Sequence, residues 1–376
     1  MTSNSSAITY KRPSVLINAI LLAMTKNPAE STVVLYRKYR PQSFKEVRDQ
    51  DHIVSVLEGA IKKGNIPHAL LFCGSRGTGK TTLARIFAKA IGTSEVDLYE
   101  IDAASNRGID DIRELREAVY TLPYESKHKV YIVDEVHMLT KEAFNALLKT
   151  LEEPPAHVVF ILATTEEDKL LDTIKSRCQI FRFRAPSRAV LNDTVTEVAK
   201  KEKFKLGKDA ADLIAIAADG SFRDALGILQ KVMMASGDSA GEADEVAAII
   251  GAPKGELLMT IVKSLHARDA EKALEAVAEA VKGGVEMKLF VRLLLERVRA
   301  VILLRNLPAR TADILAPFSE DDAKVLEELS KDNFSPLNSH LLLRLLDAAD
   351  LTFRTSIPHL PLEVAIIDLC QASENK

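Results

Sequence analysis

One eight-residue stretch constrains this 376-residue chain more than any other, because it fixes both a local fold and a type of ligand. Residues 74–81 read Gly-Ser-Arg-Gly-Thr-Gly-Lys-Thr and match G-x-x-x-x-G-K-[ST], the phosphate-binding loop. The apolar run 69–73 before it has the length of a buried strand, and apolar residues after it recur at helical spacing as far as Gly92. The sequence therefore predicts a strand, a glycine-rich loop and a helix in that order. The alternative is an ordinary glycine-rich turn, which would not require these flanking elements.

This order of elements suits a bound nucleotide. Glycines let backbone N–H groups converge on phosphate oxygens without clashes from Cβ atoms, and the helix N-terminus adds partial positive charge. We expect Lys80 to reach the β- and γ-phosphates and the Thr81 hydroxyl to bind Mg²⁺. The predicted ATP-binding residues of this stretch are Gly74, Ser75, Arg76, Gly77, Thr78, Gly79, Lys80, Thr81 and Thr82.

Two adjacent carboxylates form a second, independent motif. Asp134 and Glu135 end the apolar run that starts at residue 129, as a Walker B pair does. We expect Asp134 to hold the Mg²⁺, directly or through water, and Glu135 to polarise the attacking water and accept its proton. The alternative is a solvated acidic pair at a strand end. Thr165 ends the next apolar run and is expected near the γ-phosphate, although a threonine there is also a common turn residue.

The fold class follows from the order of the predicted elements. Strands that are apolar on both faces alternate with helices, which favours an α/β domain with a parallel sheet covered by helices. Ligands of such sheets bind beyond the carboxyl ends of the strands, where both motifs fall. From residue 187 onward only helices are predicted, with a polar stretch at 236–245 as a domain edge. We predict an extension at 1–32, the P-loop domain at 33–187, and helical domains at 188–240 and 241–376.

Composition and charge narrow the class of protein. The chain is 47% hydrophobic and 27% charged, as is ordinary for a soluble globular protein. A net charge of −3 argues against a wholly basic nucleic-acid coat but permits a local basic patch. Three widely separated cysteines predict neither a disulfide framework nor a cysteine zinc site, and fit a reducing cytoplasm.

Two apolar stretches could be mistaken for membrane segments. Residues 11–24 carry two basic residues and then an apolar run, like a signal peptide, but the run is too short to span a bilayer. We interpret 1–32 as a disordered or weakly helical extension, upstream of a possible start at Met24. Charged residues interrupt the apolar stretch 289–304, so we expect a buried bundle helix there. We also expect a cytoplasmic protein with no membrane partner.

An arginine at a predicted helix start points to a nearby anion. Ser221 can cap a helix with Asp224 in the first turn, which places Arg223 where its charge opposes the helix dipole. Bound nucleotide is one candidate for that anion, and a surface carboxylate is the other.

The motifs together resemble those of the gamma/tau subunits of bacterial DNA polymerase III clamp loaders. The resemblance is specific from about residue 33 to 235 and looser beyond. It is carried by residues 36–41, 74–82, 102–106, 134–139, 144–155, 163–165, 176–178 and 220–226.

The resemblance implies an AAA+ ATPase module, a small helical lid and a C-terminal helical collar that serves oligomerisation. It implies a ring that contains this chain, further copies of it, and delta and delta-prime subunits. This ring opens the sliding clamp and loads it on primer-template DNA during replication. Such a chain converts ATP to ADP and phosphate with Mg²⁺ as cofactor, and is not the polymerising subunit. Within the motifs, Arg177 would be the arginine finger for a neighbour's ATP, Arg223 sensor 2 in cis and Thr165 sensor 1. The residues around the adenine would be Tyr39, Arg40, Pro41 and Val47.

The chain departs from that family in three places. Members commonly carry a four-cysteine zinc module after the P-loop helix, whereas residues 91–96 here run straight to the next strand, so we predict no zinc. The glycine that often precedes Gln50 is Asp49, which bears on base binding. We expect the chain to lack the long tail that binds helicase and polymerase in the tau form, and so to be a gamma-type loader, or to depend on a separate protein that makes that link.

DNA contacts and other functions are the remaining questions. The predicted helices near 109 and 140 would face the centre of the ring, where basic residues can hold phosphates without reading sequence. The candidates are Arg107, Arg113 and Lys141, and solvated surface charges are the alternative. Another AAA+ DNA-remodelling ATPase would need a winged-helix tail or an aromatic pore loop. A non-hydrolysing scaffold subunit would not need the complete set of Lys80, Thr81, Asp134 and Glu135.

Overall fold

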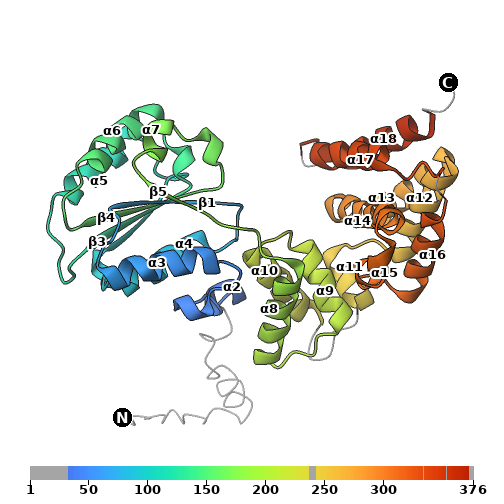
Figure 1. Ribbon diagram of the computed structural model, residues 1–376, viewed down its shortest axis with the longest axis horizontal. Coiled ribbons are helices and arrows are strands. Elements are labelled where there is room, and N and C mark those ends of the chain that lie inside the picture. The colour runs from blue at the N-terminus through green and yellow to red at the C-terminus, as the bar shows by residue number, and fades with distance from the viewer. Residues whose placement is uncertain (1–32, 237–242, 333, 353, 372–376) are drawn as a thin grey trace, which may run out of the picture. The chain divides into compact units, whose positions relative to one another are not determined.

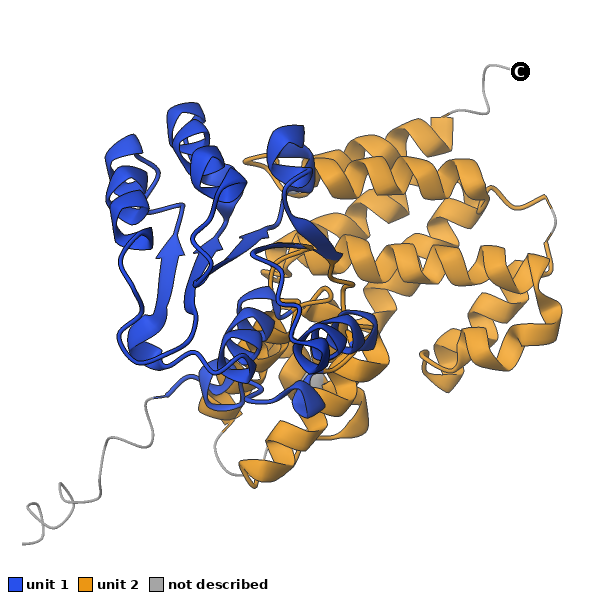
Figure 2. Cartoon of the chain, turned by 60° about the vertical axis from the view of Figure 1, so that its left-hand side comes forward, with its two compact units in different colours: residues 1–47, 51–72, 79–181 blue, residues 48–50, 73–78, 182–376 orange. Residues whose placement is uncertain are grey.

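The structure is a computed structural model that describes residues 33–236, 243–332, 334–352 and 354–371. The predicted extension at 1–32 lies outside the described residues. The chain divides into two compact units (Figure 2), one of residues 1–47, 51–72 and 79–181, the other of 48–50, 73–78 and 182–376. The first holds most of the predicted P-loop domain, and the second holds the helical parts.

A five-stranded sheet organises the first unit and confirms the predicted fold class. The strands are β1 (Ala69–Cys73), β2 (Leu98–Asp102), β3 (Lys129–Asp134), β4 (Val158–Thr164) and β5 (Gln179–Arg182), in the order β2-β3-β4-β1-β5 (Figure 1). β3 pairs in parallel with β2 and with β4, so that Val133 lies opposite both Ile101 and Leu162. β1 and β4 are buried at every residue, and β3 up to Val133, which explains their continuous apolar sequences.

The helices predicted after the phosphate-binding loop and near residues 109 and 140 are present in this unit. Its helices are α2 (Leu35–Lys38), α3 (Asp51–Lys63), α4 (Lys80–Ala90), α5 (Ile109–Val119), α6 (Lys141–Glu152) and α7 (Asp172–Lys175), with 3₁₀ turns η1 (Phe44–Glu46), η2 (Glu95–Asp97), η3 (Val136–Met138) and η4 (Glu167–Lys169). The Thr140 side chain accepts a hydrogen bond from the Ala143 N–H at 3.2 Å and so caps α6.

A buried carboxylate anchors the loop that leads into β3. Asp97 is fully buried and accepts three backbone N–H bonds, from Tyr124 at 2.7 Å, Glu125 at 2.9 Å and Ser126 at 2.8 Å. Burial by itself raises the pKa of Asp97, but the three N–H donors outweigh it and hold that pKa well below its usual range. The charged form of Asp97 therefore stabilises the folded state.

We expect Asp97→Asn to lower the free energy of unfolding at pH 7 by about 3 kcal/mol, because hydrogen bonds to a buried charge are lost. The folded-state pKa is lowered, so this contribution is complete above the ordinary carboxyl pKa of 3.8 and declines as the pH falls below it. Urea unfolding at pH 7 and at pH 3 measures both effects. The control is Asp110→Asn, which removes only the exposed ion pair with Arg113 and should cost less than about 1 kcal/mol. Equal losses in the two variants would contradict the anchoring role.

The second unit is helical, as predicted. Its helices are α8 (Arg188–Lys201), α9 (Lys208–Ala217), α10 (Phe222–Ser236), α11 (Ala243–Ile250), α12 (Gly255–Ala267), α13 (Ala270–Lys282), α14 (Met287–Asn306), α15 (Thr311–Leu315), α16 (Glu320–Ser330), α17 (Ser339–Thr352) and α18 (Leu360–Gln371), with a 3₁₀ turn η6 (Pro308–Arg310). The sequence did not predict α11, which contacts α9 and α10. The predicted boundary at 240 falls in 237–242, outside the described residues, and stays a prediction.

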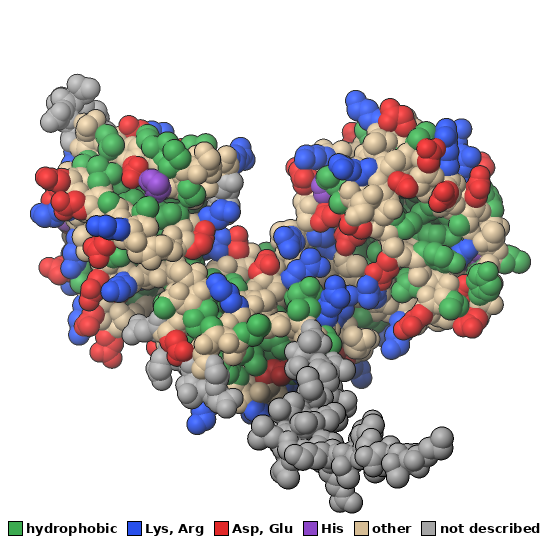
Figure 3. Space-filling view, turned by 180° about the vertical axis from the view of Figure 1, so that it is seen from behind, with side chains coloured by type: hydrophobic (Ala, Val, Ile, Leu, Met, Phe, Trp, Pro, Cys, Tyr) green, Lys and Arg blue, Asp and Glu red, His purple; other side chains and the backbone are tan. Residues whose placement is uncertain are grey.

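The apolar stretch 289–304 is a core helix. It forms most of α14, whose Phe290, Leu294, Val298 and Val301 are fully buried in the hydrophobic core of the C-terminal helices. Within the described residues, none of the helices combines the length and apolarity that a bilayer crossing needs. On the face shown in Figure 3, Lys and Arg side chains occur together with Asp and Glu, in keeping with the net charge of −3.

Candidate nucleotide-binding site

The phosphate-binding loop joins β1, which ends at Cys73, to α4, which begins at Lys80. Its glycines are required by the backbone: Gly77 has φ 76° and Gly79 has φ 102°, a region that other residues rarely adopt. A Cβ on Gly77 would lie 1.9 Å from the Ser221 hydroxyl. The Thr78 hydroxyl donates to the Ser75 carbonyl at 2.9 Å and closes the turn. The loop conformation thus depends on the glycines of the motif.

The start of α4 and the end of β3 meet in the first unit. Thr81 is in the first turn of α4, and its hydroxyl donates to Oδ2 of Asp134 at 2.8 Å. Lys80, which precedes it, is only 6% exposed despite its charge. A hydroxyl and a carboxylate oxygen are the ligand types that Mg²⁺ prefers, so these residues fit the predicted metal.

Glu135 and Thr165 are also brought together. Glu135 follows β3 with φ 48°, and its Oε2 accepts hydrogen bonds from the Thr165 hydroxyl at 2.9 Å and the Thr165 N–H at 3.2 Å. The two residues come from the ends of neighbouring strands, where the sequence predicted a shared site. The side chain of His137 lies 3.4 Å from the same oxygen. Sequence reasoning gave His137 no role, because its position two residues after Glu135 does not show that a 3₁₀ turn brings the ring back to the carboxylate.

Within the second unit, the N-terminus of α10 contacts the phosphate-loop segment. The Phe222 N–H donates to the Gly77 carbonyl at 3.0 Å, and the Ser221 hydroxyl accepts from the Asp224 N–H at 3.1 Å, which is the predicted cap. Arg223 lies exposed in this first turn. The contact with Gly77 brings the first turn of α10 to the loop, and the role of Arg223 in sensing nucleotide stays a prediction.

Arg177 is held within its own unit. It follows α7, and its guanidinium donates to the Thr173 carbonyl at 2.7 Å and to Oε1 of Glu152, at the end of α6, at 2.6 Å. A third of its side chain is exposed. The chain by itself does not test an action on a neighbour's nucleotide, so the arginine-finger role stays a prediction.

The residues predicted around the adenine lie in the N-terminal part of the described chain. Tyr39 is the C-cap of α2 and Val47 follows η1, while Arg40 and Pro41 lie between these elements, and all four are half-buried. In the other unit, Asp49 has φ 62°, which explains why glycine suits this position, and its carboxylate accepts from the Ser187 N–H at 2.9 Å.

The candidate DNA contacts lie at two adjacent helix starts. α5 and α6 pack side by side (Figure 1), and the Thr140 N–H donates to the Arg107 carbonyl at 3.2 Å. Arg107 and Lys141, the first residue of α6, therefore lie at the N-terminal ends of these two helices, and both are exposed. Arg113 pairs with Asp110 at 3.0 Å on the surface of α5. The DNA role of all three stays a prediction.

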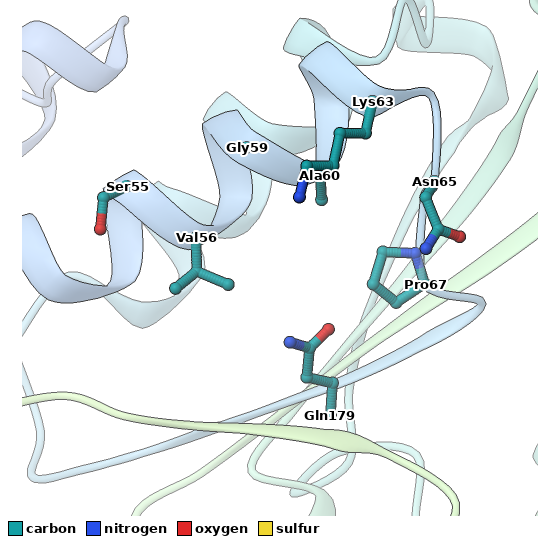
Figure 4. A pocket seen from close by; sticks show the side chains of 8 residues that line it. All are labelled: Ser55, Val56, Gly59, Ala60, Lys63, Asn65, Pro67 and Gln179. Atoms are coloured by element: carbon teal, nitrogen blue, oxygen red, sulfur yellow. The ribbon is translucent and has the colours of Figure 1, made fainter.

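A pocket elsewhere in the first unit contains none of the predicted site residues. It has a volume of about 580 Å³ and lies between α3 and β5 (Figure 4), lined by Ser55, Val56, Gly59, Ala60, Lys63, Asn65, Pro67 and Gln179. In the part of the chain that the structure describes, no group of three or more His, Cys, Asp or Glu residues could hold a metal ion. The predicted lack of a zinc module remains a prediction.

The matching family models and the most similar relatives are all DNA polymerase III subunits. Three family models match successive parts of the chain: DNA polymerase III, delta subunit, at 92–187; DNA polymerase III clamp loader subunit, ATPase lid domain, at 191–237; and DNA polymerase III subunits gamma and tau domain III, at 242–376. DNA polymerase III subunit tau of Bacillus subtilis is 36% identical over 364 residues, 90% of this chain. The chain belongs to the DNA polymerase III gamma/tau family.

This gamma/tau-family chain spans 63% of the length of the Bacillus subtilis protein. It is also 36% identical over 304 residues to DNA polymerase III subunit tau of Escherichia coli, covering 75% of this chain and 47% of that protein. Among solved structures, the RuvB Holliday-junction branch migration motor of Thermotoga maritima aligns with 66% of this chain and 86% of its own, at 21% identity and a TM-score of 0.48. The parallel sheet, the ATPase lid and the C-terminal helices form the predicted AAA+ architecture.

Proposed function

We propose that this gamma/tau-family chain is an ATP-hydrolysing subunit of the clamp loader of the DNA polymerase III holoenzyme, which loads the sliding clamp onto primed DNA. The observation that carries the proposal is the hydrogen bond of 2.8 Å between Thr81 and Asp134, which brings two magnesium ligand types together beside the buried Lys80. A scaffold subunit that does not hydrolyse ATP has no need of this arrangement together with Glu135. We place the AAA+ domain at 33–187, the lid at 188–240 and the collar at 241–376.

In this proposal each site residue has a separate task. Residues 74–82, with Lys80 among them, bind the phosphates. Residues 39–41 and Val47 surround the base. Thr81 and Asp134 would hold Mg²⁺, which would supply positive charge against the phosphate oxygens. Glu135 accepts the proton of the attacking water through the carboxylate that Thr165 orients. Arg223 senses the nucleotide in cis.

The proposed partners are further copies of this chain, the delta and delta-prime subunits, the sliding clamp and primer-template DNA. Support for a ring comes from the collar, where α17 and α18 expose large apolar side chains: Leu343, Leu346, Leu351, Leu360 and Val364. Apolar area of this kind favours association with another protein surface. The basic residues Arg107, Arg113 and Lys141 would hold DNA phosphates.

The function is tested by the ATPase rate of the chain assembled with delta and delta-prime. We expect the rate to rise most when the sliding clamp and primed DNA are both present, because loading couples hydrolysis to the two together. Four reactions are compared: no addition, clamp alone, primed DNA alone, and both. Stimulation by DNA alone, unaffected by clamp, would favour another AAA+ DNA-remodelling ATPase. Tight ATP binding without turnover in any mixture would favour a scaffold subunit.

A further inference from the structure

A histidine lies between the carboxylate of the proposed catalytic base, Glu135, and a second carboxylate, Glu166. His137 is in the 3₁₀ turn η3, which the hydrogen bond from the Met138 N–H to the Glu135 carbonyl closes at 2.8 Å. Nδ1 of the ring lies 3.0 Å from the Thr164 hydroxyl and 3.4 Å from Oε2 of Glu135. Nε2 lies 3.2 Å from Oε1 of Glu166. Both ring nitrogens thus contact polar groups.

Burial makes these contacts significant. The His137 side chain is only 6% exposed, so water does not replace the partners of its nitrogens, and a buried polar group without partners is costly. Thr164, which faces Nδ1, is fully buried and also accepts the Glu166 N–H at 3.0 Å. The ring is therefore held on both sides by the end of β4 and the residues after it, 164–166.

The same segment holds the proposed base. Oε2 of Glu135 accepts two hydrogen bonds from Thr165 and faces Nδ1 of His137, whereas no described residue donates a hydrogen bond to Oε1. One oxygen of the carboxylate is thus held by the protein, and the other is available to a water. The relative position of the η3 turn and the residues 164–166 decides where that second oxygen points.

We propose that His137 is a positioning residue for ATP hydrolysis: it fastens the turn that carries Glu135 to the segment that carries Thr165. Backbone pairing of β3 with β4 ends at Val133 and Leu162, so beyond that point side chains connect the ends of these two strands. Thr165 makes one such connection, to Glu135, and His137 makes a second one through Thr164 and Glu166. The inference rests on the proposed function, since it concerns the base of that reaction.

The proposal predicts an effect on turnover and not on binding. We expect His137→Leu to lower kcat for ATP roughly 100-fold, because a small displacement of a catalytic group costs about that much. The affinity for ATP and KM should stay near wild type, since His137 is not among the residues proposed to bind ATP. Steady-state ATPase rates of the assembled loader and ATP titration of the isolated chain measure the two quantities.

Two amide substitutions at His137 distinguish the contact of Nδ1 from the contact of Nε2. In His137→Asn the amide nitrogen takes the place of Nδ1 and can still reach Thr164, whereas in His137→Gln it takes the place of Nε2 and can reach Glu166 only. We expect the Asn variant to recover most of kcat and the Gln variant to remain close to Leu. His157→Leu is the matched control, because the ring of that histidine, directly before β4, bonds to the carbonyls of Val119 and Thr121 and to no residue of the proposed site. It should leave kcat unchanged.

A second substitution tests the connection without touching the histidine. Thr164→Val removes the hydroxyl but keeps the branched shape, and it should lower kcat as His137→Leu does. The double variant should be no slower than the slower single variant, because both break one connection. Wild-type kcat in His137→Leu, or full additivity of the two losses, would overturn the proposal. An inactive wild-type loader would instead contradict the proposed function, so the two failures are distinguishable.

Discussion

Lys80→Ala is expected to abolish ATP binding at concentrations that saturate the wild-type chain. Lys80 is the first residue of α4 and is 6% exposed, so its ammonium group is kept largely from water and meets the phosphates at little further desolvation cost. Charge-assisted hydrogen bonds to phosphate are about twice as strong as neutral ones. Losing them should raise Kd for ATP at least about 100-fold, which corresponds to about 2.7 kcal/mol. Fluorescence titration with an ATP analogue measures the change.

The control for this variant is Lys89→Ala. Lys89 lies in the last turn of the same helix and is exposed, so the substitution removes a lysine from α4 without removing a phosphate ligand. Its Kd should equal that of the wild type, and circular dichroism should show the same helix content in both variants. Unchanged ATP affinity in Lys80→Ala would refute the assignment of residues 74–81 to phosphate binding.

The sequence was sufficient where chemistry requires particular residues in a fixed local order. Gly77 and Gly79 of the phosphate loop adopt left-handed backbone conformations, which glycine can adopt without strain. The apolar runs of β1, β3 and β4 reflect burial on both faces of the sheet. For the same reason the meeting of strand ends could be predicted, and the structure brings together Thr81 with Asp134 and Glu135 with Thr165.

The sequence was insufficient where a side chain acts through a contact that its own segment does not show. His137 returns to Glu135 only because Glu135 adopts φ 48° and the chain turns after it. Asp97 is a lone acidic residue before a strand, and nothing nearby indicates that the N–H groups of residues 124–126 converge on it. The other partners of His137, Thr164 and Glu166, and those of Asp97 are supplied by tertiary structure, which local patterns do not describe.

Arg177→Ala is expected to leave ATP binding by the isolated chain unchanged while it lowers kcat of the assembled ring by about 10³-fold or more, the effect of an arginine that stabilises transition-state charge. In the single chain Arg177 donates to Glu152, an ion pair with a third of the arginine side chain and about half of the glutamate exposed. An exposed pair of this kind contributes little to stability, so Arg177 can exchange Glu152 for a neighbour's phosphate at small cost. ATPase rates and ATP titrations of the same preparations separate the two effects.

Two further variants decide whether the arginine acts in trans. Glu152→Ala removes the competing carboxylate and should leave ring turnover intact, because Arg177 then has no ion pair to give up. Arg85→Ala removes an arginine from another exposed ion pair, with Glu100, and should also have no effect on turnover. The decisive experiment mixes two defective chains: Arg177→Ala lacks the arginine, and Lys80→Ala lacks the phosphate ligand. If Arg177 serves the ATP of a neighbour, a mixed ring contains sites at which a Lys80→Ala chain presents its arginine to an intact pocket, and turnover partly returns. If it serves its own chain, every site in the mixture carries one defect and turnover stays lost, which would contradict the assignment in trans.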